Sequence, residues 1–134
     1  MHAAPIFAGL KIEAAEIRVI RLPLLVPFVI STGTMTEKII PILTLRAEGL
    51  EGYAEGVMDP LPDYLEETIS GSLSFLRDVL LPQIVGKRFA GPADLSAILD
   101  PWRGHRMSKA MVEMAVWDLS LIHISDGARE ACRS

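Results

Sequence analysis

The spacing of apolar residues predicts three strands in the first half of the chain. Residues 11–22 alternate loosely between apolar and polar positions, the period of a strand with one buried face. Residues 39–46 are nearly all apolar and β-branched, which favours a strand covered on both faces, although Pro41 removes one ladder donor and favours an edge or a bulge. A reversal at 48–52 leads to a third strand over residues 53–57. These segments predict an antiparallel meander that needs other elements to cover it.

Residues 23–37 separate the first two predicted strands. Short polar residues and a glycine gather at 31–36, and they favour backbone turns over a ladder. We therefore expect a loop here, long enough to reach outward from the sheet.

A period of 3.6 residues predicts three helices in the second half. The first is expected to begin with Asp63 as N-cap and Glu66 three residues later, and its apolar positions run from 65 to 80. A shorter helix is expected to begin at Pro92, and a third near Arg106. The order predicts an α+β fold, in which a three-stranded antiparallel meander precedes a three-helix layer.

Composition narrows the class of protein. The 134 residues are 50% hydrophobic and 22% charged, which suits one globular domain. A net charge of −4 gives no concentrated positive face, so we expect no nucleic-acid partner and no anionic membrane surface. The longest apolar run, 24–30, is far shorter than the ~20 residues of a membrane span, and the start of the chain lacks a basic signal region. The expected location is the cytoplasm.

The residues alone do not predict a reaction. The carboxylates of 48, 51, 66 and 67 lie at predicted turns or a helix start, where solvation and the helix dipole explain them. His2 and His105 lack a second ligand at zinc-helix spacing, and His105 suits capping or packing before a helix. We therefore predict no metal site and no catalytic residue on this chain.

Three segments form a set of motifs in a fixed order. Residues 103–119 are RGHRMSKAMVEMAVWDL, residues 27–34 are PFVISTGT, and residues 52–58, GYAEGVM, precede Pro62, Tyr64, Glu67 and Thr68. Together they resemble the N-terminal capping domain of the enolase superfamily, in the branch of o-succinylbenzoate synthases and N-acylamino-acid racemases. The patterns of that branch are R-G-[HN]-x-M-[AS]-[KR]-A-x-x-E-M-A-x-W-D-L, P-F-x-T-S-F-G-T, and G-[WY]-[GA]-E followed by P-x-Y-x-x-E-[TY].

The resemblance implies that two loops close over the substrate. Residues 27–34 correspond to the first capping loop and residues 52–68 to the second. The implied substrate-binding residues are Phe28, Ser31, Thr32, Gly33, Met58 and Tyr64. Thr32 stands where the family usually has an aromatic residue, so the resemblance says little about which acyl group is held.

The resemblance assigns catalysis to a barrel that this sequence lacks. In the family, the C-terminal (β/α) barrel supplies three acidic ligands for Mg²⁺ and two lysines that move the proton next to a carboxylate. We expect the parent to be an o-succinylbenzoate synthase-like lyase of menaquinone biosynthesis, to act on a small carboxylate and to form a homo-oligomer. An N-acylamino-acid racemase is the alternative, and a freestanding binding module is the alternative of another class. This chain alone is expected to be inactive and to bind no Mg²⁺.

The last residues resemble no enzyme of that family. Residues 119–125, LSLIHIS, resemble the conceptual translation of a transposase mosaic-end adaptor, CTG TCT CTT ATA CAC ATC T. We therefore predict an N-terminal extension at 1–10, a capping domain at 11–119 and a non-native tail at 120–134. The alternative is a native amphipathic helix end, in which Leu121, Ile122 and Ile124 pack.

Overall fold

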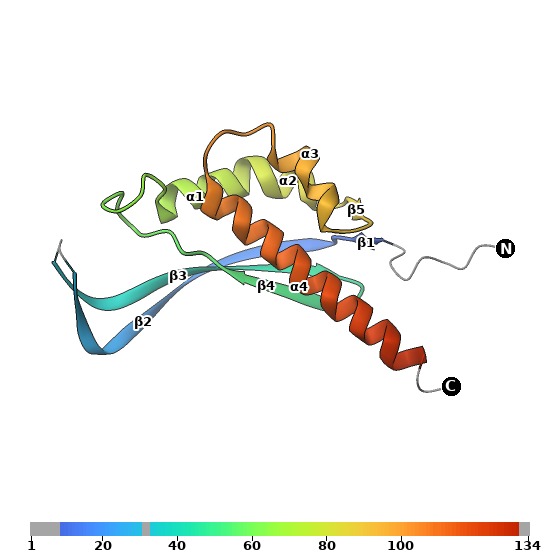
Figure 1. The fold of residues 1–134 in the computed structure, drawn as a ribbon, viewed down its shortest axis with the longest axis horizontal. Coiled ribbons are helices and arrows are strands. Elements are labelled where there is room, and N and C mark those ends of the chain that lie inside the picture. Colours follow the sequence, from blue (N-terminus) through green and yellow to red (C-terminus); the bar gives the residue numbers. More distant parts are fainter. Residues whose placement is uncertain (1–8, 31–32, 132–134) are drawn as a thin grey trace.

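The structure is a computed structural model that describes residues 9–30 and 33–131 (Figure 1). In chain order the elements are β1 (Leu10–Lys11), β2 (Ala14–Ile30), β3 (Gly33–Ala47), β4 (Leu50–Glu55), α1 (Ile69–Phe75), the π-helical segment η1 (Leu76–Leu80), α2 (Leu81–Ile84), β5 (Arg88–Phe89), the 3-10 segment η2 (Pro92–Leu95), α3 (Ser96–Leu99) and α4 (Arg106–Ala131). Strands β2, β3 and β4 form one antiparallel sheet in that order. The predicted α+β meander followed by helices is confirmed.

The hairpin of β2 and β3 extends well beyond the end of β4 (Figure 1). The predicted loop over 23–37 is wrong, since Pro23 pairs with Glu37 and Phe28 pairs with Met35. The register shifts between Pro23 and Phe28, so residues 24–27 form a bulge opposite residue 36. β2 is an edge strand, and edge strands and bulges tolerate prolines such as Pro23 and Pro27.

Pro41 lies in the central strand, β3, at the position where the neighbouring strand β4 ends. Proline has no N–H to donate there. It pairs with Val19 of β2, and its carbonyl accepts a hydrogen bond from the Gly56 N–H at 2.7 Å. In an antiparallel ladder, the N and O atoms of one residue point to the same neighbouring strand. The proline nitrogen therefore points to the place where β4 has just ended at Glu55, so no ladder hydrogen bond is lost. The expectation of an edge or a bulge at Pro41 is wrong, because β3 is the central strand and its register with β2 is regular there.

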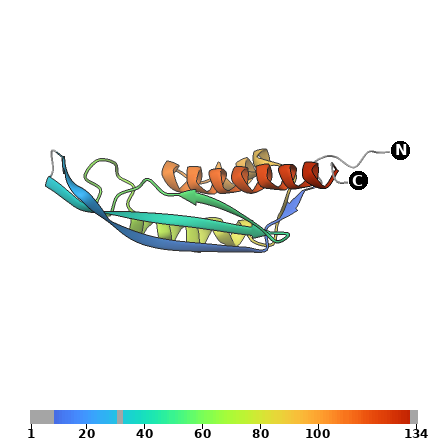
Figure 2. The ribbon, with the colours of Figure 1, turned by 90° about the horizontal axis from the view of Figure 1, so that it is seen from below.

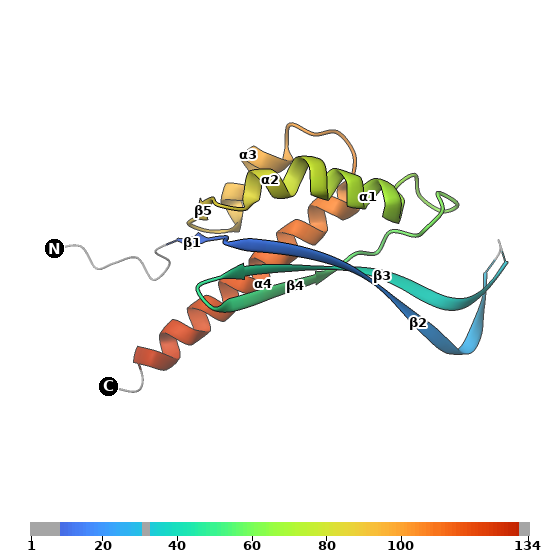
Figure 3. The same ribbon diagram turned by 180° about the vertical axis from the view of Figure 1, so that it is seen from behind.

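The helices cover the sheet and enclose the core. α4 crosses β4 and β3, and α1, η1 and α2 run as one rod beside β2 (Figures 2 and 3). The largest fully buried side chains come from strands and helices alike and include Leu43, Leu45, Leu76, Leu80, Ile84, Leu95, Met111 and Leu119. A Cβ added to Gly52 would lie 2.7 Å from the Leu119 Cβ, so a glycine is needed where α4 rests on β4.

The first helix begins later than predicted. Thr68 is its N-cap, with the side-chain oxygen accepting from the Gly71 N–H at 3.1 Å, and Asp63 lies in the preceding segment. Residues 60–66 are all exposed, so no helix face here has a core to cover. The helix starts predicted at Pro92 and Arg106 are confirmed.

Two features at the ends of the chain complete the fold. β1 pairs with β5, a pairing with no signal in the sequence, and it buries Leu10 against Phe89. α4 continues through residues 120–131; Ser120 is buried, whereas Leu121 is exposed. The non-native origin of 120–134 stays a prediction. Within residues 9–30 and 33–131, no helix is long and apolar enough to cross a membrane.

Candidate substrate-gating end of the domain

The two predicted capping loops lie at the same end of the molecule. We call this region the loop end: the outer part of the β2–β3 hairpin, residues 23–30 and 33–37, together with residues 56–68. In Figures 1, 2 and 3 it lies opposite the end where β1 and the last turns of α4 are found. Segments about 30 positions apart in sequence are thus neighbours because β3 and β4 return the chain to the base of the hairpin arm.

The described residues of the first loop lie at the outer end of the hairpin arm. Phe28 pairs with Met35, and its side chain is exposed. Gly33 begins β3 with φ of 150°, a conformation that favours glycine. Ser31 and Thr32, two of the predicted substrate-binding residues, lie outside the described residues. Phe28 therefore lies in the outer part of the arm, near the end of β2.

The second loop is closed at its base. The Ile69 N–H donates to the Asp59 carbonyl at 2.9 Å, and this bond holds the two ends of residues 60–67 together. Tyr64 is 85% exposed, so its ring points away from the domain. Met58 is 2% exposed and lies beside Met111, in the core. The substrate-binding roles given to Tyr64 and Met58 stay predictions, and the two side chains lie in different environments.

A groove lies between the outer part of β3 and the base of the second loop. It has a volume of about 260 Å³ and is lined by residues 35 and 37–39 of β3 and by residues 55–60. Among the predicted site residues, Met58 is the one that lines it. Met35 and Lys38 also line the groove and were not predicted, because Met35 falls in the expected loop over 23–37 and Lys38 lies between that loop and the strand predicted at 39–46. The sequence pattern did not show that these two residues lie on a strand, β3, opposite the second loop.

Glu67 attaches the second loop to α4. Its carboxylate accepts hydrogen bonds from the Met107 N–H at 2.9 Å and from the Ser108 N–H at 2.8 Å. The sequence suggested that Glu67 serves the dipole of its own helix, whereas the structure has it cap a helix 40 residues away. His105 precedes the same helix and stacks on Phe75, with 4.3 Å between ring centroids, which agrees with a packing role.

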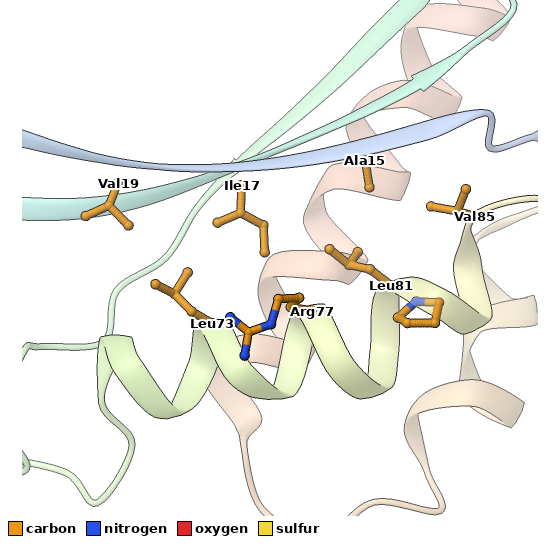
Figure 4. Close-up of a pocket in the computed structure, with 8 residues that line it drawn as sticks. Ala15, Ile17, Val19, Leu73, Arg77, Leu81 and Val85 are labelled. Atoms are coloured by element: carbon orange, nitrogen blue, oxygen red, sulfur yellow. The ribbon is translucent and has the colours of Figure 1, made fainter.

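A second groove lies along the body of the domain, between β2 and the rod of α1, η1 and α2 (Figure 4). Its volume is about 490 Å³, and its lining is apolar apart from Arg77. The Arg77 Nε atom donates to the Asp78 carboxylate at 2.9 Å. Binding sites for small polar ligands combine an apolar lining with several converging polar groups. This groove lacks that combination, and we assign it no substrate.

The perturbed carboxylates lie on the sheet. Hydrogen bonds from Arg18 and Arg46 lower the pKa of the Glu16 carboxyl below its ordinary value. Hydrogen bonds from Tyr53 and Arg46 likewise lower the pKa of Glu51. These ion pairs are solvent-exposed, where such pairs contribute little to stability. Surface pairing explains both shifts, and neither carboxylate is an acid or base held for catalysis.

No metal centre can be built from the described part of the chain. Within residues 9–30 and 33–131, no three His, Cys, Asp or Glu side chains gather closely enough to hold an ion. The described residues therefore do not fit a Mg²⁺ site.

The fold agrees with the comparisons. Residues 13–121 match the family of the mandelate racemase / muconate lactonizing enzyme N-terminal domain. The chain belongs to this family and thereby to the enolase superfamily.

The chain is 46% identical over 110 residues to an N-succinylamino acid racemase of Thermus thermophilus, covering 82% of the chain and 30% of the relative. It is 40% identical over 98 residues to an o-succinylbenzoate synthase of Listeria innocua, covering 72% of the chain and 26% of the relative. An enolase-superfamily protein of Listeria innocua has a similar structure, with a TM-score of 0.77 and 36% identity over 82% of the chain and 30% of that protein. The chain thus spans less than a third of the length of these relatives.

Proposed function

We propose that the chain is the substrate-gating part of an o-succinylbenzoate synthase-like enzyme. The parent would remove the proton next to a carboxylate and dehydrate a cyclohexadiene carboxylate on the route to menaquinone. The observation that carries the proposal is that the outer hairpin arm and the second loop lie at one end of the domain, with a groove between the outer part of β3 and the base of the second loop. The similarity to a protein named o-succinylbenzoate synthase supports it.

An N-succinylamino acid racemase is the second candidate. The 46% identity to the Thermus protein of that name favours it. The two reactions begin with the same proton abstraction. We expect the residues that separate them to lie largely in the part of the relatives that this chain does not span.

The proposed division of labour leaves the chemistry to the parent's barrel. The Mg²⁺ ion, its acidic ligands and the two lysines belong to that barrel. The loop end would close over a small carboxylate substrate and exclude water from it. Phe28 and Tyr64 suit this role because their exposed rings can cover the apolar part of a substrate.

A chimaera tests the proposal. Residues 13–119 of this chain replace the matching segment of the Thermus racemase, and dehydration of the cyclohexadiene carboxylate and racemisation of an N-succinylamino acid are both measured. We expect the chimaera to turn over at least one substrate. The 134-residue chain with Mg²⁺ should show no turnover above buffer, and metal-dependent turnover by the chain alone would contradict the proposal.

Tyr64→Ala in the chimaera tests the gating role. We expect a changed preference between the two substrates, with Mg²⁺ affinity near that of the unsubstituted chimaera. Tyr53→Ala is the matched control, because this exposed tyrosine lies on β4, outside the loop end. A parallel loss of Mg²⁺ binding would argue against the gating role of Tyr64.

The DNA that follows codon 119 separates these proposals from the freestanding module. A continuing frame that encodes barrel lysines and acidic ligands would support the enzyme. A stop codon after Ser134 in independent long reads would support the module.

A further inference from the structure

Glu67 differs from the rest of the second loop in its surroundings. Residues 60–66 are exposed, whereas Glu67 is partly buried and uses both carboxylate oxygens. Oε1 accepts from the Met107 N–H, and Oε2 accepts from the N–H and the hydroxyl of Ser108. Hydrogen bonds from backbone N–H groups to a carboxylate are charge-assisted, and the start of a helix favours the negative charge. These bonds join residues 40 and 41 positions apart.

Ser108 extends this contact into the core. Its Oγ lies 2.7 Å from the Oγ of Ser72, a residue of α1, and both serines are fully buried. The Ser108 hydroxyl has one proton, which it donates to the Glu67 carboxylate. Ser72 must therefore donate to Ser108. The donors therefore follow one direction, from Ser72 of α1 to Ser108 of α4 and from Ser108 to Glu67 of the second loop. This direction is set by the Glu67 carboxylate, because it can only accept.

The base of the second loop thus has two attachments. The bond from the Ile69 N–H to the Asp59 carbonyl closes the loop on itself. Glu67, two residues before Ile69, attaches the closed loop to α4. The first attachment fixes the shape of the base, and the second fixes its place relative to α4.

From this arrangement we infer that Glu67 is a positioning residue: its carboxylate holds the second loop against the start of α4 and thereby sets the substrate preference of the parent enzyme. The effect on preference rests on the proposed function, whereas the effect on loop position does not. Tyr64 lies three residues before Glu67 in the loop, and its side chain is exposed. Glu67 would act on the substrate through Tyr64 and the exposed residues beside it. The two motifs that contain Glu67 and Ser108 would then be one structural unit.

Hydrogen exchange with mass spectrometry on the full 134-residue chain tests the positioning step. Glu67→Gln keeps the size of the side chain but presents an amide NH₂ where backbone N–H groups need an acceptor. We expect exchange to become about tenfold faster in peptides covering 59–68 and 104–109, and unchanged in a peptide covering 111–119. Glu66→Gln, an exposed neighbour, is the matched control and should change none of them.

Two results would overturn the inference. Faster exchange in 104–109 alone would make Glu67 a helix cap with no hold on the loop. Equal acceleration in all peptides, including 40–47, would show a loss of overall stability.

If Glu67→Gln does not fold, the Ser108→Ala variant tests the inference in its place, because it removes the hydroxyl and leaves both backbone N–H groups. Ser108→Ala should accelerate exchange in the same two regions by a smaller factor, and no acceleration in 59–68 would overturn the inference.

The chimaera tests the effect on preference. A loss of folded enzyme lowers kcat for both substrates alike and leaves both KM values unchanged. We expect Glu67→Gln instead to change the ratio of the two kcat/KM values about threefold or more, mainly through KM. Glu113→Gln, at an exposed position of α4 outside the loop end, is the control and should leave the ratio unchanged. A parallel fall for both substrates would overturn the role in preference. If the unsubstituted chimaera turns over neither substrate, the proposed function fails, and the exchange experiment still decides the loop position.

Discussion

The body of the domain and its loop end contain similar residues in opposite surroundings. In the body, Leu43 of β3 is 0% exposed beneath the helices. In the outer hairpin arm, Leu25 is 103% exposed, and Val26 and Val29 are also open to solvent. Both segments are equally apolar in the sequence. The difference arises because the sheet under α4 has three strands and is covered by helices. The described arm has two strands, and it extends past the end of β4 and past the helices.

This comparison shows that apolar composition alone does not identify the core. Large contiguous apolar patches are rare on soluble monomers and usually mark a surface that something else covers. The chain spans less than a third of its relatives' length. We propose that the loop end covers the substrate and the barrel mouth of the parent, so its apolar side chains contribute to closure more than to folding.

The largest expected difference is between two leucines. Leu43→Ala should lower the free energy of unfolding by about 3 kcal/mol, because it leaves a cavity in the core. Leu25→Ala should change it by less than about 0.5 kcal/mol, because this side chain has no buried contacts to lose. Urea unfolding followed by circular dichroism measures both. Equal losses for the two variants would show that the hairpin arm is covered in solution.

A second pair compares glycines. Gly52→Ala should cost about 2 kcal/mol, because the new methyl group would press on α4. Gly91→Ala is the control, since a Cβ there has nothing within 4 Å and the backbone is extended. The same unfolding experiment applies. A neutral Gly52→Ala would mean that α4 lies farther from β4 than described.

The loop end should also govern association. We expect the chain to self-associate and to bind a hydrophobic dye, because its exposed apolar side chains have no cover. Replacing Leu25 and Val26 with serine should reduce the dye signal by about half, whereas Leu121→Ser, outside the loop end, should reduce it less. A sharp monomeric light-scattering peak without dye binding would contradict this expectation and favour the freestanding module.

The smallest effect is expected from the tail. Deleting residues 120–134 should change the free energy of unfolding by less than about 1 kcal/mol, because Leu121 and Ile124 are exposed and an ion pair such as His123 with Glu48 contributes little at a surface. The main loss would be the buried Ser120. A decrease of several kcal/mol would show that these residues belong to the fold and that the tail is native.

Local signals in the sequence were sufficient for much of the fold. Pro92 and Arg106 begin their helices as predicted, because proline geometry and helical periodicity act within a few residues. The start of the first helix was predicted too early because Asp63 with Glu66 matches the capping-box pattern, as a true helix start would. Thr68 caps the helix instead, since apolar positions reach the core only from Ile69 onward.

The candidate site was less accessible to sequence reasoning. The motifs identified the two loops but could not distinguish the buried Met58 from the exposed Tyr64. The motifs also included Glu67 but did not indicate which groups its carboxylate binds. The carboxylate and the Met107 N–H are 40 residues apart, and no local pattern specifies a contact at that distance.

The sequence by itself determined the family and the order in which a three-stranded meander precedes the helices, because periodicity and motifs are properties of neighbouring residues. Tertiary structure alone decided the length of the hairpin arm, the pairing of β1 with β5 and the capping of α4 by Glu67. Each of these depends on which distant segments meet. An apolar or charged residue has the same chemistry wherever it lies, and its role depends on the partner that the fold brings to it.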